Sequence, residues 1–287
     1  MDHIIVDDFL DNISCEKLID DATHYCPKTL GIEMHGGRNF IPFSSVHWRQ
    51  LLKVSAVWQS LHIRLQSQEF IDWVVEELAP PGCDQDLRST TCYGKRRSWL
   101  ASRIQEERRM RTASDFTFFR GGKLGKFSFS ILIRLLDQWM NIRRKIIYYR
   151  QRFSGGTAVE LLYDYSRASD GYFREIHRDS DLRRYVFLLY LNQLDEESEG
   201  GDLRIYKLRN PEAGFPGRPR EEDCVLVQSY PPKAGRLVVF RNTSESYHST
   251  GKMNGHSQDR NFLYGGITQL GGTNPNMRLA LDDMPTE

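Results

Sequence analysis

Hydrophobic residues recur at helical spacing in the first half of the chain. Residues 3–9 read as a short strand, and a helical stretch is expected to begin at Ser14. Between residues 57 and 78 the apolar positions fall near helical spacing, which predicts an amphipathic helix. Pro80-Pro81-Gly82 then stops this helix, because proline cannot continue the helical hydrogen bonding.

From Val159 onward the hydrophobic period changes to two, which is typical of strands. Val159, Leu161, Tyr163 and Tyr165 alternate with other residues and therefore share one face of a strand. Turn residues separate further predicted strands at 172–178, 184–192, 202–206, 224–229, 236–241 and 261–268, with a short piece at Tyr247-His248. About eight short strands are the number expected of a jelly roll. We therefore predict an α+β fold, in which N-terminal helices accompany a double-stranded β-helix (jelly-roll) core.

The clearest break in the chain is Ser154-Gly155-Gly156. It divides an N-terminal helical region with an edge strand, residues 1–157, from the predicted jelly-roll core, residues 158–270. The last segment, residues 271–287, is expected to be a loosely ordered tail.

The charge is distributed unevenly. Residues 84–152 contain 17 Lys and Arg against 6 Asp and Glu, although the whole chain has 39 and 38. Apolar residues at helical spacing between 126 and 150 predict a basic helical insertion here. Three interpretations stay open: an insertion that packs against the acidic remainder, a surface for an anionic partner such as RNA or another nucleic acid, and a lid that selects the substrate.

The composition, with 39% hydrophobic and 27% charged residues, is that of a globular protein. The five cysteines are odd in number and include no Cys-x-x-Cys pair, which suits a reducing compartment and offers no zinc site. The N-terminus lacks the features of a signal peptide, and the longest apolar stretch, residues 127–136, is too short to cross a bilayer. We expect a soluble cytoplasmic protein without a membrane partner.

A candidate metal site lies in the strand-rich half. In His177-Arg178-Asp179 the imidazole and the carboxylate are two residues apart, so they point to the same side of an extended strand. A second imidazole, His248, follows the predicted strand at 236–241. Two neutral nitrogens and one carboxylate form a facial triad that leaves three coordination positions open. Fe(II) needs these positions for a bidentate 2-oxo acid and for O₂.

The order of the surrounding motifs adds a family resemblance. Residues 158–270 resemble the prolyl 4-hydroxylase-like branch of the 2-oxoglutarate/Fe(II) dioxygenase superfamily. The stretches that match, in the family's order, are Tyr165 to Tyr172 before His177-Arg178-Asp179, Arg184 to Asn192, Gly200 to Ile205, Pro231 to Phe240 before His248, and Arg260 to Leu263.

The resemblance implies specific roles. His177, Asp179 and His248 would be the catalytic iron ligands, and Arg260 would bind the distal carboxylate of 2-oxoglutarate. His256 competes with His248, but it lies only four residues before Arg260, which leaves too little chain to separate the iron from that carboxylate.

A tyrosine is expected to support the same carboxylate. Tyr165 occupies the family's position, but two extra residues separate Gly171-Tyr172 from His177, so Tyr163 on the same strand face is an alternative.

The implied activity is hydroxylation of a C–H bond in a peptidyl or free amino-acid substrate, with a prolyl residue among the candidates. It would consume 2-oxoglutarate and O₂ and release succinate and CO₂. Related halogenases lack the triad carboxylate, so Asp179 favours hydroxylation. Two alternatives are a jelly-roll binding module with a structural or vestigial metal site, which recruits an anionic partner through the basic insertion, and a cupin-like metalloenzyme without a 2-oxo acid. Arg260 and the complete triad argue against both.

Overall fold

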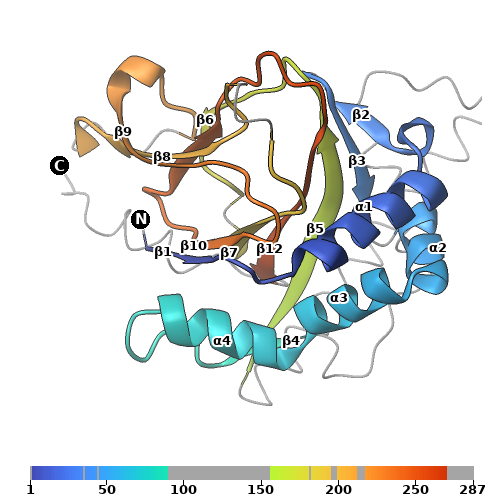
Figure 1. The fold of residues 1–287 in the computed structure, drawn as a ribbon. Coiled ribbons are helices and arrows are strands. Elements are labelled where there is room, and N and C mark those ends of the chain that lie inside the picture. The colour runs from blue at the N-terminus through green and yellow to red at the C-terminus, as the bar shows by residue number, and fades with distance from the viewer. Residues whose placement is uncertain are drawn as a thin grey trace, which may run out of the picture.

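The computed structural model describes residues 2–34, 36–43, 45–89, 156–180, 182–194, 199–211 and 217–269 of this chain. They form a mixed α/β fold with two mostly antiparallel sheets and a layer of helices (Figure 1). These coarse features agree with the expectation from the sequence. The predicted basic insertion, from residue 90 onward, and the predicted tail, residues 271–287, lie outside the described residues.

The described helices belong to the N-terminal region. They are α1 (Asn12–Tyr25), α2 (Val46–Val54), α3 (Ala56–Gln66) and α4 (Gln68–Leu78), with short 3₁₀ turns η1 (Lys28–Leu30) and η4 (Glu221–Asp223). Each α-helix begins after an Asp or Ser whose side chain accepts a hydrogen bond from a backbone N–H of the first turn. None of the helices in the described ranges is long and apolar enough to cross a membrane.

The single helix predicted between residues 57 and 78 is wrong, because the chain forms α3 and α4 instead. Ser67 separates them, and its hydroxyl accepts a hydrogen bond from the N–H of Phe70 at 3.1 Å. The serine therefore starts a second helix where the apolar spacing alone continues without interruption.

The larger sheet has the strand order β1-β10-β7-β12-β5-β3-β2, and β4 pairs with β5 in parallel. The smaller sheet has the order β6-β11-β8-β9. The strands of the larger sheet are β1 (His3–Val6), β2 (Ile32–Met34), β3 (Arg38–Pro42), β4 (Leu87–Ser89), β5 (Thr157–Ala168), β7 (Arg183–Tyr190), β10 (Leu237–Arg241) and β12 (Arg260–Gln269). Those of the smaller sheet are β6 (Arg174–His177), β8 (Leu203–Leu208), β9 (Cys224–Tyr230) and β11 (Tyr247–Thr250).

Every strand predicted from the period of two is present, with shifts of a few residues at the ends. The sequence pattern did not predict β2, β3 and β4, which add to the same sheet as β5. The hydrophobic core joins residues from both sides of the expected boundary at residue 157.

The two faces of the larger sheet have different neighbours. One face packs against the helices, where Trp48 and Trp58 lie beside Tyr163 and Tyr165; this is the helix-facing side. The other face packs against the smaller sheet through a separate apolar cluster that includes Val186 on β7, Leu203, Ile205, Val238, Phe240 and Phe262; this is the inner face. Figure 1 shows the helices on one side of the larger sheet and β6, β8 and β9 on the other. The candidate metal site lies between the sheets.

Candidate metal centre

Two neighbouring strands of the smaller sheet place the two histidines side by side. In the antiparallel pair of β6 and β11, His177 lies directly opposite His248. Residues in this relation project from the same face of a sheet, so the rings meet, with centroids 4.4 Å apart. Both side chains are buried.

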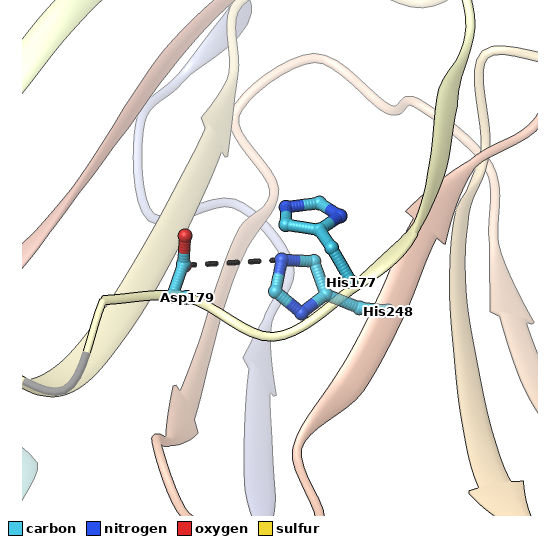
Figure 2. A group of neighbouring side chains, drawn as sticks. All are labelled: His177, Asp179 and His248. Atoms are coloured by element: carbon cyan, nitrogen blue, oxygen red, sulfur yellow. Dashed lines mark ion pairs between the residues drawn. The ribbon is translucent and has the colours of Figure 1, made fainter. Parts of the chain in front are cut away.

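Asp179 completes the group just beyond the end of β6. One of its carboxylate oxygens lies 3.8 Å from Nε2 of His248, and Figure 2 shows the carboxylate facing the two rings. One ligand atom from each of the three residues lies within 4.8 Å of the others. The structure therefore brings together the three residues that the sequence predicted as a triad, although β6 ends at His177.

Backbone carbonyls orient both imidazoles. Nδ1 of His177 lies 2.8 Å from the carbonyl oxygen of Glu175, and Nδ1 of His248 lies 3.1 Å from that of Ser246. A carbonyl can only accept, so each Nδ1 carries the proton and each Nε2 keeps its lone pair. Among the described atoms, the buried Nε2 of His248 has no hydrogen-bond partner.

Burial keeps both rings neutral. It lowers the pKa of His177 to about 3, with a contribution from the neighbouring His248. Burial also lowers the pKa of His248. Neutral imidazoles with an available Nε2 are the form in which histidine binds a metal, so the donor set fits a divalent transition-metal ion.

Asp179 is held as a carboxylate. Burial alone would raise its pKa, but the positive charge of Arg183, 3.3 Å away, the neighbouring His248 and a hydrogen bond from Tyr264 outweigh burial and lower the pKa to about 2. The hydroxyl of Tyr264 donates to the carboxylate, at 2.5 and 2.6 Å from its two oxygens. Arg183 and Tyr264 therefore fix the charge and the orientation of the third ligand.

Arg260 is a buried cation on the inner face. Its side chain lies over the rings of Phe262 and Tyr190, at 4.3 and 5.0 Å, and Nη2 donates to the hydroxyl of Tyr190 at 3.2 Å. Among the residues that the structure describes, its Nε has no hydrogen-bond partner, and no carboxylate forms an ion pair with it. A buried guanidinium without a counter-charge is costly, and a carboxylate from a bound molecule fits it.

The structure does not bring Tyr163 or Tyr165 to Arg260, so it provides no contact for the cofactor role expected of either tyrosine. They share a strand face as predicted, but this face is the helix-facing side. Tyr163 lies by His62, and Tyr165 donates to Asn261. Arg260 lies opposite Ala168 on the inner face, where Tyr190 is the tyrosine that contacts it.

The sequence analysis did not predict Arg183 and Tyr264 as residues of the site. Tyr264 follows Arg260 by four residues on β12 and therefore lies on the same strand face, which was a usable signal. Arg183 reaches the inner face next to a register irregularity between β7 and β12, which no sequence pattern indicates.

His256 does not join the triad. Its Nε2 lies 2.8 Å from the carbonyl oxygen of Glu199, and its backbone N–H donates to Asp170. The turn that carries it therefore holds its ring away from His177 and Asp179, and His248 is the second histidine of the group.

Residues 162–265 match the family model described as the 2OG-Fe(II) oxygenase superfamily. The matched range contains the triad and Arg260. No curated protein matches the chain.

Solved structures that resemble the chain include three hydroxylases. A prolyl-4-hydroxylase from Pseudomonas putida has a TM-score of 0.45 and 15% identity, over 94% of each chain. A viral collagen prolyl hydroxylase from Paramecium Bursaria Chlorella virus-1 has a TM-score of 0.42 and 12% identity, over 93% of this chain and 96% of the other. A prolyl hydroxylase from Trichoplax adhaerens has a TM-score of 0.42 and 10% identity, over 97% of this chain and 87% of the other.

Proposed function

Because this chain, through residues 162–265, belongs to the 2OG-Fe(II) oxygenase superfamily, we propose that it is a dioxygenase that hydroxylates a C–H bond of a peptidyl or free amino-acid substrate. The cofactors of this superfamily are Fe(II), 2-oxoglutarate and O₂. The proposed products are the hydroxylated substrate, succinate and CO₂. A prolyl substrate is what the sequence resemblance implies. The jelly-roll topology stays a prediction from the strand count, and the division at residue 157 stays a prediction from the break at Ser154-Gly155-Gly156.

The observation that carries the proposal is the clustering of the three ligand atoms within 4.8 Å, with an unpartnered buried Nε2 on His248. In this proposal His177, Asp179 and His248 hold the iron and leave its other coordination positions to small molecules. The bound iron supplies the activation of O₂, a chemistry for which protein side chains alone are unsuited.

Neighbouring residues hold the three metal ligands in the protonation state and orientation that metal binding requires. The carbonyls of Glu175 and Ser246 hold the protons of the two rings at Nδ1, away from the centre. Arg183 and Tyr264 keep Asp179 ionised and oriented. Each ligand atom is therefore already in its binding form before the metal arrives, and few protons need to leave.

Arg260 and Tyr190 are the proposed anchor for the distal carboxylate of 2-oxoglutarate. The guanidinium offers parallel N–H donors that match a carboxylate, and the rings of Phe262 and Tyr190 exclude water around them. This assignment replaces the role expected of Tyr163 and Tyr165.

The experiment that tests the function is turnover of 2-oxoglutarate without any added substrate. Purified protein with Fe(II), O₂ and 2-oxoglutarate should release succinate, and omission of Fe(II) should stop the release. The His177→Ala variant should be inactive, whereas His256→Ala, which changes a buried histidine outside the triad, should keep the activity. A folded protein that binds Fe(II) but never consumes 2-oxoglutarate would favour the alternative of a binding module with a vestigial metal site.

A further inference from the structure

Three arginines gather on the inner face of the larger sheet. Arg38 on β3 and Arg260 on β12 lie on either side of β5, and both are register partners of Ala168. Phe262 lies between them, with Arg260 4.3 Å and Arg38 5.5 Å from its ring centre. The third, Arg183 on β7, packs over the ring of Tyr264 at 4.9 Å.

Two of these charges have a counter-charge in the proposed complex. Arg183 pairs with Asp179 at 3.3 Å, and Arg260 is assigned to the distal carboxylate of 2-oxoglutarate. Arg38 has neither. No carboxylate in the described part of the chain forms an ion pair with Arg38. Its guanidinium donates instead to the hydroxyl of Ser166, 3.1 Å from Nε and 2.8 Å from Nη2. A guanidinium has five N–H donors, so the donors of Nη1 stay available.

Aromatic side chains around Arg38 reduce the screening of its charge by water. Its Cζ lies 5.4 to 5.5 Å from the ring centres of Phe40, Phe262 and Tyr264, and the side chain is only partly exposed. Aromatic rings displace water, so a charge among them is less screened than a charge at an open surface. An anion that reaches Arg38 therefore binds more strongly than it would to a surface arginine.

Tyr264 connects Arg38 to the metal centre. The centre of its ring lies 5.5 Å from Cζ of Arg38, and its hydroxyl donates a hydrogen bond to Asp179. Arg38 and Tyr264 thus lie on the same inner face, and Tyr264 contacts both Arg38 and the proposed iron ligand Asp179. A molecule that places a C–H bond at the triad can reach Arg38 with a group only a few bonds away.

We propose that Arg38 is a specificity-determining residue that binds an anionic group, a carboxylate or a phosphate, on the substrate. This inference rests on the proposed function, because it takes the triad as the reacting centre. It narrows the substrate class from any peptidyl or free amino acid to one that carries a negative charge near the hydroxylated carbon. The planar fork of the guanidinium suits the two oxygens of either group.

The test measures anion binding to the protein loaded with Fe(II) and saturating 2-oxoglutarate under anaerobic conditions, where no turnover occurs. Isothermal titration uses three probes: inorganic phosphate, N-acetylaspartate α-amide, whose only charge is the side-chain carboxylate, and the neutral N-acetylasparagine α-amide. The ionic strength is held constant by KCl. Phosphate or N-acetylaspartate α-amide should bind, and N-acetylasparagine α-amide should bind at least about tenfold more weakly than the better anion. A preference for phosphate or for the carboxylate tells which anionic group the site accepts.

Variants locate the site. Arg38→Gln should raise the Kd of the better anion by about tenfold or more, and Arg38→Lys by less, since lysine keeps the charge without the fork. The matched control is Arg64→Gln, because Arg64 also lies over an aromatic ring, that of Phe9 at 3.7 Å, but belongs to α3. This control should bind the anion as the wild type does. If Arg38→Gln does not fold, the role of Arg38 is tested by the Kd of the anion for Arg38→Lys and by the comparison of the acid and amide probes with the wild type.

Three results would overturn the inference: neither anion binds, the amide binds as tightly as the acid, or the Arg38 variants bind the anion unchanged. Succinate release without substrate tests the proposed function separately. Release without anion binding rejects only the role of Arg38. Anion binding at Arg38 in a protein that never turns over 2-oxoglutarate rejects the dioxygenase.

Discussion

At the scale of single residues, the nitrogen that does not face the backbone decides what a buried histidine does. Among the described residues, His248 keeps Nε2 free beside His177 and Asp179, because its Nδ1 donates to Ser246. His256 uses Nε2 to contact a carbonyl oxygen, and its free Nδ1 does not belong to this group of ligand atoms. Two buried histidines eight positions apart are therefore prepared for different tasks. A metal ion is the partner that suits the first.

His248→Ala should abolish tight binding of Fe(II), because only two ligands remain. His256→Ala should leave binding intact and serves as the control. Equilibrium dialysis with Fe(II) under anaerobic conditions measures the stoichiometry, with about one ion per chain expected for the wild type and for the control. Undiminished binding in His248→Ala would show that the ion lies elsewhere.

Arg260→Ala should weaken 2-oxoglutarate binding by about a hundredfold, because a buried carboxylate loses its counter-charge and two donors. Arg260→Lys should recover part of the loss. The measurement is the KM for 2-oxoglutarate in the succinate assay. An unchanged KM in Arg260→Ala would place the anchor at another residue.

His62 predicts how stability depends on pH. Burial lowers its pKa to about 4 in the folded chain, below the ordinary value of 6.5. Between these values the unfolded chain binds more protons, so the free energy of unfolding falls as the pH drops from 6.5 towards 4, by up to about 1.4 kcal/mol per pH unit for one group. His62→Gln should make this slope less steep in urea titrations of the metal-free protein. Parallel slopes for the two proteins would exclude a role for His62.

The tyrosines show how far residue-scale prediction reached. A period of two correctly placed Tyr163 and Tyr165 on one face, but it does not say which face of the sheet turns towards the metal. The helices decided this, because Trp48 and Trp58 pack against those rings. The triad was easier to predict from the sequence, because His177 and Asp179 are close in sequence and a protein core seldom contains such polar residues.

At the scale of elements, Ser55 joins three helices. It ends α2, accepts a hydrogen bond from Trp58 at the start of α3, and donates to Asp21 of α1 at 2.6 Å. Its side chain is buried. One hydroxyl thus fixes the mutual arrangement of the helices that cover the helix-facing side.

Ser55→Ala should lower the free energy of unfolding by about 1–3 kcal/mol, because it removes a helix cap and leaves Asp21 with one hydrogen bond fewer. Ser60→Ala, at an exposed position of α3, is the control and should change it by less than about 0.5 kcal/mol. Chemical denaturation measures both. Equal values for the two variants would contradict the capping role.

Elements were predictable where their period was long and regular, as in β5 and β12. The hairpin of β2 and β3 was not, because each strand is short and Gly36 and Gly37 in the turn interrupt any alternation. It is stabilised by pairing with β5, a contact between residues far apart in sequence. The sequence alone therefore could not place Arg38 near the metal centre; the pairing of β3 with β5 in the structure does.

At the scale of the whole molecule, a buried ion pair holds the loop between α4 and β4 against β7 of the larger sheet. Asp84 accepts from Nη1 of Arg184 at 2.5 Å and from the hydroxyl of Tyr185 at 2.7 Å. Both charged side chains are 5% exposed. Asp84 has a positive φ of 58°, which Asn also tolerates.

Asp84→Asn should lower the free energy of unfolding by about 3 kcal/mol, because Arg184 stays buried without its counter-charge. Asp7→Asn removes a carboxylate from the more exposed pair with Arg236 and should cost less than about 1 kcal/mol. Chemical denaturation of both variants makes the comparison. A smaller loss in Asp84→Asn than in Asp7→Asn would contradict the importance of burial.

The outermost strand of the larger sheet has a practical consequence for protein production. β1 pairs along its whole length with β10, from His3 opposite Phe240 to Val6 opposite Leu237. A recombinant product trimmed of its first eight residues would leave the backbone donors and acceptors of β10 open beside apolar side chains. Such an open edge can pair with strands of other molecules, so removal of β1 is expected to promote aggregation.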